Sequence, residues 1–140
     1  MPRLSIDEVY MDVAYTISQL SYAERRKVGC VIVKDNQIVS FGYNGTPTGF
    51  DNQCEHGHGE ELTTKREVLH AESNALTKIA KSTMSSDGAD LYTTTSPCFE
   101  CSKLIVQSGI NRVFYSEEYR DVEGLELLNK AKVDVIRLKR

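Results

Sequence analysis

The sequence predicts an α/β protein: a three-layer α/β/α sandwich around a five-stranded mixed sheet. Two β-rich segments, 28–33 and 38–43, flank a short polar turn and indicate an antiparallel hairpin. From residue 70 onward, helical and extended patterns alternate, which favours parallel strands joined by crossover helices. The expected helices are 5–20, 70–82, 98–107 and 121–131, and the later expected strands are 89–94, 113–115 and 133–138.

Each helix is supported by periodicity or by its ends. Apolar side chains at 6, 9, 10, 13, 14, 17 and 20 form one helical stripe, and Ser5 with Glu8 predicts a capping box at its start. Pro97 and Gly109 suit the beginning and the end of the helix between them. The polar stretch 44–69 has no periodicity, and a segment of this length inside a compact domain is usually functional.

Size and charge narrow the function classes. We expect 140 residues to form a single domain, 1–140. The net charge of -3 argues against a general nucleic acid surface, so a small-molecule ligand is favoured. We find no apolar run of membrane-spanning length and no apolar stretch after the first residues, so we expect no membrane association and a cytoplasmic location.

The chemistry is concentrated at two expected helix starts, His70-Ala71-Glu72 and Pro97-Cys98-Phe99-Glu100-Cys101. One imidazole and two thiolates are typical ligands of a catalytic zinc ion, whose fourth position is left for water. Taken singly, His70 and Glu72 could be first-turn helix residues, and the two cysteines could form a structural clip or a redox pair. Together, H-x-E followed by P-C-x-x-C is the signature of zinc nucleobase deaminases, in which Glu72 moves protons and is not a ligand.

Four segments extend this pattern along the chain: R-R-K-V-G-C-V-I-V, G-Y-N-G-T-P-T-G at 42–49, H-A-E-S-N-A at 70–75 and T-T-S-P-C-F-E-C at 94–101. In the same order they resemble the deoxycytidylate deaminases of the cytidine deaminase-like superfamily, over roughly residues 5–138. The resemblance implies the cytidine deaminase-like fold and hydrolysis of dCMP to dUMP and ammonia. It also implies a role in supplying dUMP for thymidylate synthesis.

The resemblance also implies the substrate-binding residues. Asn44 would hydrogen-bond the sugar or base, although Asn-Gly alone would also read as a tight turn. Ser96 lies in the last of the four segments and is expected to contact substrate. A monophosphate needs cationic or donor groups. Arg26 and Tyr119 are the first choices among the candidates Arg25, Arg26, Lys27, Tyr119 and Arg120, and for each basic residue the alternative is a solvated charge.

Further features follow from the resemblance alone. Some relatives hold a second, structural zinc ion, and Cys54, His56 and His58 form a C-x-H-x-H cluster in the corresponding loop, with the fourth ligand missing. Relatives are commonly hexamers, activated by dCTP and inhibited by dTTP with Mg²⁺. Asn74 and Lys81 resemble contributors to that effector site, and both also read as ordinary exposed helix residues.

Three other functions stay open at this point. A tRNA or single-stranded nucleic acid deaminase shares the zinc motifs. A deaminase of free nucleosides or bases would lack the dependence on phosphate. A zinc-stabilised binding module without turnover would have no use for Glu72 beside an open metal position.

Overall fold

The computed structural model describes residues 2–139, and within them the chain folds as one mixed sheet covered by helices on both faces. This confirms the predicted sandwich and its five strands. In spatial order the strands are β2 (Gln37–Tyr43), β1 (Gly29–Lys34), β5 (Asp90–Thr95), β6 (Arg112–Glu117) and β7 (Asp134–Arg137). The helices are α1 (Ile6–Ser18), α2 (Ala71–Ala80), α3 (Phe99–Gln107) and α4 (Glu123–Lys130).

The strand directions follow from the connections. β1 pairs with β2 and with β5 in antiparallel fashion, whereas β5, β6 and β7 run parallel. Asp35 and Asn36 form the β1–β2 turn with φ values of 51° and 63°. Left-handed backbone at both central residues matches the twist of a tight hairpin. The parallel strands end at one edge of the sheet, which brings the residues after β5 and β6 together.

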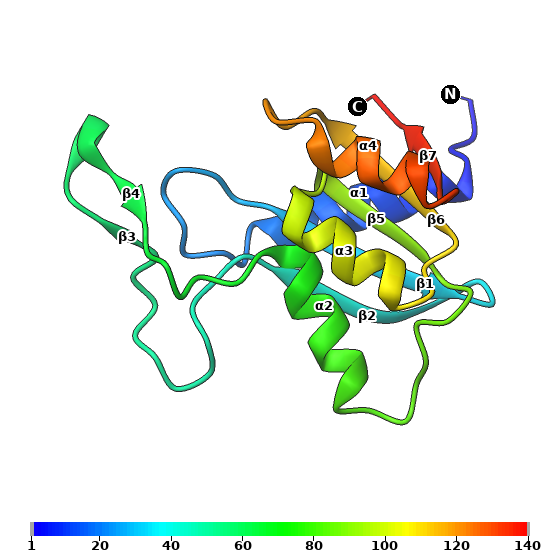
Figure 1. The fold of residues 1–140 in the computed structure, drawn as a ribbon, viewed down its shortest axis with the longest axis horizontal. Coiled ribbons are helices and arrows are strands. Elements are labelled where there is room, and N and C mark those ends of the chain that lie inside the picture. The colour runs from blue at the N-terminus through cyan, green and yellow to red at the C-terminus, as the bar shows by residue number, and fades with distance from the viewer. Residues whose placement is uncertain (1, 140) are drawn as a thin grey trace.

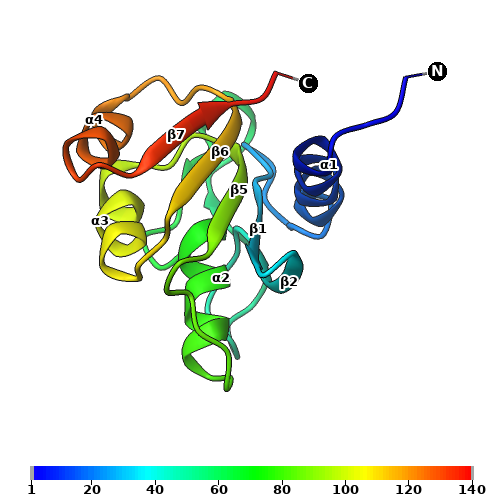
Figure 2. The same cartoon turned by 90° about the vertical axis from the view of Figure 1, so that its right-hand side faces the viewer.

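The helices divide unequally between the two faces of the sheet. α1 covers one face alone, and α2, α3 and α4 cover the other (Figure 2). Glycines allow close packing on both faces: a Cβ at Gly29 would meet the Ala14 carbonyl of α1, and a Cβ at Gly42 would meet the Ala71 carbonyl of α2. Close approach of α2 to the sheet places the start of that helix beside the end of β5.

Local signals are confirmed with small shifts at the ends of elements. Ser5 caps α1 in the expected capping box. The Ser5 N–H donates to the Glu8 Oε1 at 2.9 Å, and the Glu8 N–H donates to the Ser5 Oγ at 3.2 Å. The helix ends at Ser18, two residues before the expected end, and the last apolar position of the stripe, Leu20, lies in the turn that follows. None of the helices within residues 2–139 has the length and apolar character needed to cross a bilayer.

The polar stretch after β2 contains short structure that the sequence pattern does not indicate. β3 (Glu55–His56) and β4 (Thr63–Thr64) form a two-stranded hairpin around a 3-10 turn, Gly59–Glu61. The hairpin projects from the body of the sheet (Figure 1). Strands of two residues are too short to show alternation, so periodicity could not predict them.

Candidate active site

Two helix starts build the centre of the site. His70 is the N-cap residue of α2, Cys98 is the N-cap residue of α3, and Cys101 lies in the first turn of α3. The His70 Nδ1 atom is 3.3 Å from the Cys98 Sγ and 3.4 Å from the Cys101 Sγ. Residues 28 positions apart in the chain are therefore gathered at the same end of the sheet.

The three side chains fit a zinc ion. Their ligand atoms lie within 4.8 Å of one another. Tetrahedral zinc with usual bond lengths would set nitrogen and sulfur about 3.6 Å apart, close to the separations found here. Hydrogen bonds from Cys101 and His70 lower the pKa of the Cys98 thiol and so favour its thiolate, the form that binds metal. A nitrogen and two sulfurs leave the fourth position that a catalytic zinc site requires.

Glu72 lies in the first turn of α2, beside these ligands. The residue is 3% exposed, and its Oε1 accepts a hydrogen bond of 2.7 Å from the Thr93 hydroxyl of β5. Burial raises the pKa of Glu72, and the hydrogen bond from Thr93 opposes that shift. A buried carboxylate with a raised pKa is suited to taking up and returning a proton near neutral pH.

The Thr93 hydroxyl has a second acceptor, the Thr95 carbonyl oxygen, at 2.8 Å. A hydroxyl has one proton, so Thr93 donates to only one of the two at a time. It can donate to the Glu72 carboxylate, or accept a hydrogen bond from the neutral Glu72 carboxyl group and donate to the Thr95 carbonyl. Both protonation states of Glu72 therefore keep a hydrogen-bond partner.

A cavity of about 540 Å³ opens in front of this group. The cavity is lined by Glu72 and by two of the three candidate zinc ligands, His70 and Cys98. It is also lined by all four expected substrate-binding residues: Arg26, Asn44, Ser96 and Tyr119. Arg25 and Arg120 line it as well, whereas Lys27 is not among its lining residues. The volume is in the range of small-molecule sites.

The Asn44 side chain ties the loop before β1 to the end of β2. Its Oδ1 accepts from the Val28 N–H at 2.9 Å, and its Nδ2 donates to the Arg26 carbonyl at 2.8 Å. An amide nitrogen has two protons, so one remains for another partner. Asn44 thus supports the loop that carries Arg26 while it faces the cavity.

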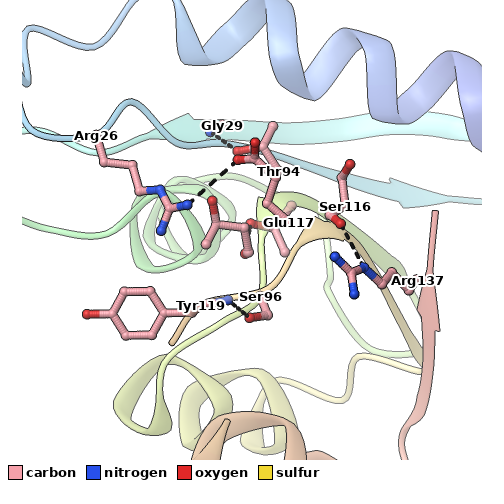
Figure 3. Close-up of polar contacts among 10 residues, drawn as sticks. Arg26, Gly29, Thr94, Ser96, Ser116, Glu117, Tyr119 and Arg137 are labelled. Atoms are coloured by element: carbon pink, nitrogen blue, oxygen red, sulfur yellow. Dashed lines mark hydrogen bonds and ion pairs between the residues drawn. The ribbon is translucent and has the colours of Figure 1, made fainter. Parts of the chain in front are cut away.

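The opposite rim of the cavity is held by Ser96 and by the segment after β6. The Ser96 Oγ accepts from the Tyr119 backbone N–H at 2.7 Å (Figure 3). The Arg26 guanidinium reaches toward Glu117, 3.9 Å away, across the same rim. Both partners of that ion pair are largely exposed, so Arg26 can turn to another anion at little cost.

Other expected groups are not assembled. Among residues 2–139, the ligand atoms of Cys54, His56 and His58 do not gather as a metal-binding group. Cys54 is buried and contacts the Asn52 carbonyl. On α2, the Asn74 Nδ2 donates to the Tyr43 carbonyl at 2.7 Å, which gives this side chain a role in packing α2 against β2, and Lys81 is exposed at the end of the helix.

Two residues of the site were not predicted from the sequence. Thr93 supports Glu72, and Glu55 of β3 lines the cavity with its side chain buried. The run of threonines at 93–95 before Ser96 was a usable signal, because polar residues at the end of a buried strand need partners. Glu55 carried no such signal.

Comparison with known proteins places this geometry in a family. The family model of the cytidine and deoxycytidylate deaminase zinc-binding region matches residues 4–117. The deoxycytidylate deaminase of Saccharomyces cerevisiae is 38% identical over 141 residues, which cover 95% of this chain and 45% of the yeast protein. That of Mycobacterium phage D29 is 36% identical over 132 residues, covering 84% of this chain and 99% of the phage protein.

A solved structure agrees closely with the fold. The crystal structure of dCMP deaminase from cyanophage S-TIM5 in complex with dCMP and dUMP superposes with a TM-score of 0.90 at 44% identity. The match covers 99% of this chain and 100% of the cyanophage chain, whereas this chain spans less than half of the yeast relative. With the zinc-ligand cluster, the buried glutamate and the sandwich all in place, the chain belongs to the cytidine and deoxycytidylate deaminase family.

Proposed function

We propose that this chain catalyses the hydrolytic deamination of dCMP to dUMP and ammonia. The observation that carries the proposal is the buried Glu72 next to the His70, Cys98 and Cys101 cluster, at the base of a cavity whose rim carries arginines. Relatives named for this activity, and one solved with dCMP and dUMP, support the choice of substrate. The 1–140 segment would act as one catalytic domain.

His70, Cys98 and Cys101 would hold a zinc ion, and the chemistry that this ion would supply is a lower pKa for a bound water molecule. Glu72 would take the first proton from water and pass it to the ring N3 as the water oxygen adds to C4. It would then take the second proton from that oxygen and pass it to the C4 amino group, which leaves as ammonia. Thr93 keeps the Glu72 carboxyl in place in both of its protonation states.

The remaining cavity residues would bind the nucleotide. Asn44 and Ser96 line the cavity next to the zinc cluster and would contact the sugar and the base. Arg26 and Tyr119 face each other across the rim and would hold the phosphate, with Arg25 and Arg120 nearby. Four charged or donor groups around one opening suit a phosphomonoester.

The resemblance adds features that belong to the proposal alone: a hexamer, activation by dCTP, inhibition by dTTP with Mg²⁺, and an effector site that includes Asn74 and Lys81. A second zinc ion on Cys54, His56 and His58 is not part of the proposal, because the ligand atoms of these residues do not gather as a metal-binding group within residues 2–139. A cytoplasmic location, expected from the sequence, is also part of the proposal.

The test is a substrate panel of dCMP, CMP, deoxycytidine and a short cytosine-containing DNA, followed by ultraviolet absorbance. We expect turnover of dCMP, and a loss of about 10²-fold or more in Glu72→Gln with zinc content unchanged. Activity confined to the oligonucleotide or to deoxycytidine would contradict the assignment of a nucleotide substrate.

A further inference from the structure

The Glu55 carboxylate lies in an unusual place for a charged group. β3 and β4 project from the sheet, and His56, Thr63 and Thr64 around Glu55 are exposed. Glu55 itself is 3% exposed and lines the cavity. Burying a carboxylate is costly unless hydrogen-bond donors compensate for the lost water, so its partners show what the residue is for.

Those partners are two backbone amides of the loop before β1. The Glu55 Oε2 accepts from the N–H groups of Glu24 and Arg25, both at 3.0 Å. The contact joins segments about 30 residues apart in the chain. A second contact repeats the connection, because the Arg25 Nη1 donates to the Thr64 Oγ1 at 3.1 Å. The β3–β4 hairpin is therefore connected to the loop before β1 mainly by hydrogen bonds to one oxygen, the Glu55 Oε2.

The loop that Glu55 holds carries two of the three arginines that line the cavity. Arg25 donates its backbone N–H to Glu55, and Arg26 is the next residue. Because Glu55 holds the backbone N–H groups of the two residues before Arg26, it restricts the backbone orientation from which the Arg26 side chain extends. Asn44 holds the same loop from the other side through the Arg26 carbonyl.

We infer that Glu55 is a positioning residue for the phosphate end of the site: it holds the 24–26 loop so that Arg26 meets the substrate's phosphate. The inference rests on the proposed function. It assigns to the β3–β4 hairpin a role in selecting a nucleotide over a nucleoside.

The test compares substrates with and without phosphate. For Glu55→Ala, kcat/KM for dCMP should fall by about tenfold or more, since two charge-assisted hydrogen bonds are lost, and that for deoxycytidine by less than about threefold. Glu55→Gln keeps an oxygen at the end of an equally long side chain and should recover much of the dCMP activity. Binding of dUMP and deoxyuridine, measured by calorimetry, should show the same difference without turnover.

Asp51→Ala is the matched control. Asp51 lies in the same 44–69 stretch, but its contacts to Gln53 and Lys65 stay within that stretch, and it does not line the cavity. It should leave the ratio of dCMP to deoxycytidine activity unchanged. An equal loss on both substrates in Glu55→Ala, or no loss on either, would overturn the inference. A wild-type protein that does not favour dCMP over deoxycytidine would instead overturn the proposed function.

Discussion

Thr93→Val tests the support of Glu72, the carboxylate that is proposed to move protons. The change removes one hydroxyl and keeps nearly the same shape in a side chain that is fully buried. The Glu72 Oε1 then loses a donor at 2.7 Å, in a place where water cannot easily replace it. Hydrogen bonds to charged groups contribute about 1.5–3 kcal/mol, which corresponds to about 10- to 150-fold in rate. We expect kcat/KM for dCMP to fall within this range.

The pH profile gives a second readout of the same variant. The hydrogen bond from Thr93 lowers the pKa of Glu72 against the larger effect of burial. Its removal should therefore raise that pKa further, so that the acidic limb of kcat/KM moves to higher pH. A change that only loosened the fold would lower the rate at every pH without moving this limb.

Two further variants control the experiment. Thr93→Ser keeps the hydroxyl and should restore most of the activity. Thr94→Val removes the neighbouring buried hydroxyl, which bonds the Gly29 N–H at 3.2 Å and does not contact Glu72 (Figure 3). It should cost stability of about 1 kcal/mol and leave the rate unchanged. Activity of Thr93→Val within twofold of wild type, at equal zinc content, would refute the reasoning.

Three other changes test separate parts of the structure. Gly29→Ala forces a methyl group against the α1 backbone, so the free energy of unfolding, measured by urea denaturation, should fall by about 1–3 kcal/mol. At Gly45 an added methyl group would face open space, so Gly45→Ala should leave the free energy of unfolding unchanged. Cys54→Ser should leave the zinc content, measured by mass spectrometry, at one ion per chain; a drop from two to one would reveal the second site. Arg26→Ala should raise KM for dCMP about tenfold at low salt, and an unchanged KM would remove Arg26 from the phosphate site.

The sheet and the zinc cluster could be predicted because their signals are local. His70 and Glu72 are two residues apart, Cys98 and Cys101 three apart, and each pair lies at a helix start that the sequence indicates. The order of helices and strands then brings both starts to one edge of the sheet. Short-range spacing and chain connectivity were sufficient, without any knowledge of side-chain contacts.

Thr93 and Glu55 could not be predicted in the same way. The partner of Thr93 is 21 residues away, and the contact depends on how α2 packs against β1 and β2 of the sheet. The partners of Glu55 are backbone amides, which every residue except proline has, so no pattern in the sequence marks them. Asn44 was predicted to face the site, but its bonds to the loop at 26–28 became visible only in the structure.

The position of the zinc ligands at the starts of α2 and α3 also affects folding. A metal ion bound to His70 and Cys98 joins chain positions 28 residues apart. By the loop-entropy relation used for disulfides, a cross-link of this length restricts the unfolded chain by about 3–4 kcal/mol. The melting temperature should therefore rise with the concentration of free zinc. A substitution on α2 or α3 that only weakens metal binding will then resemble a folding defect, until zinc content and activity are measured on the same sample.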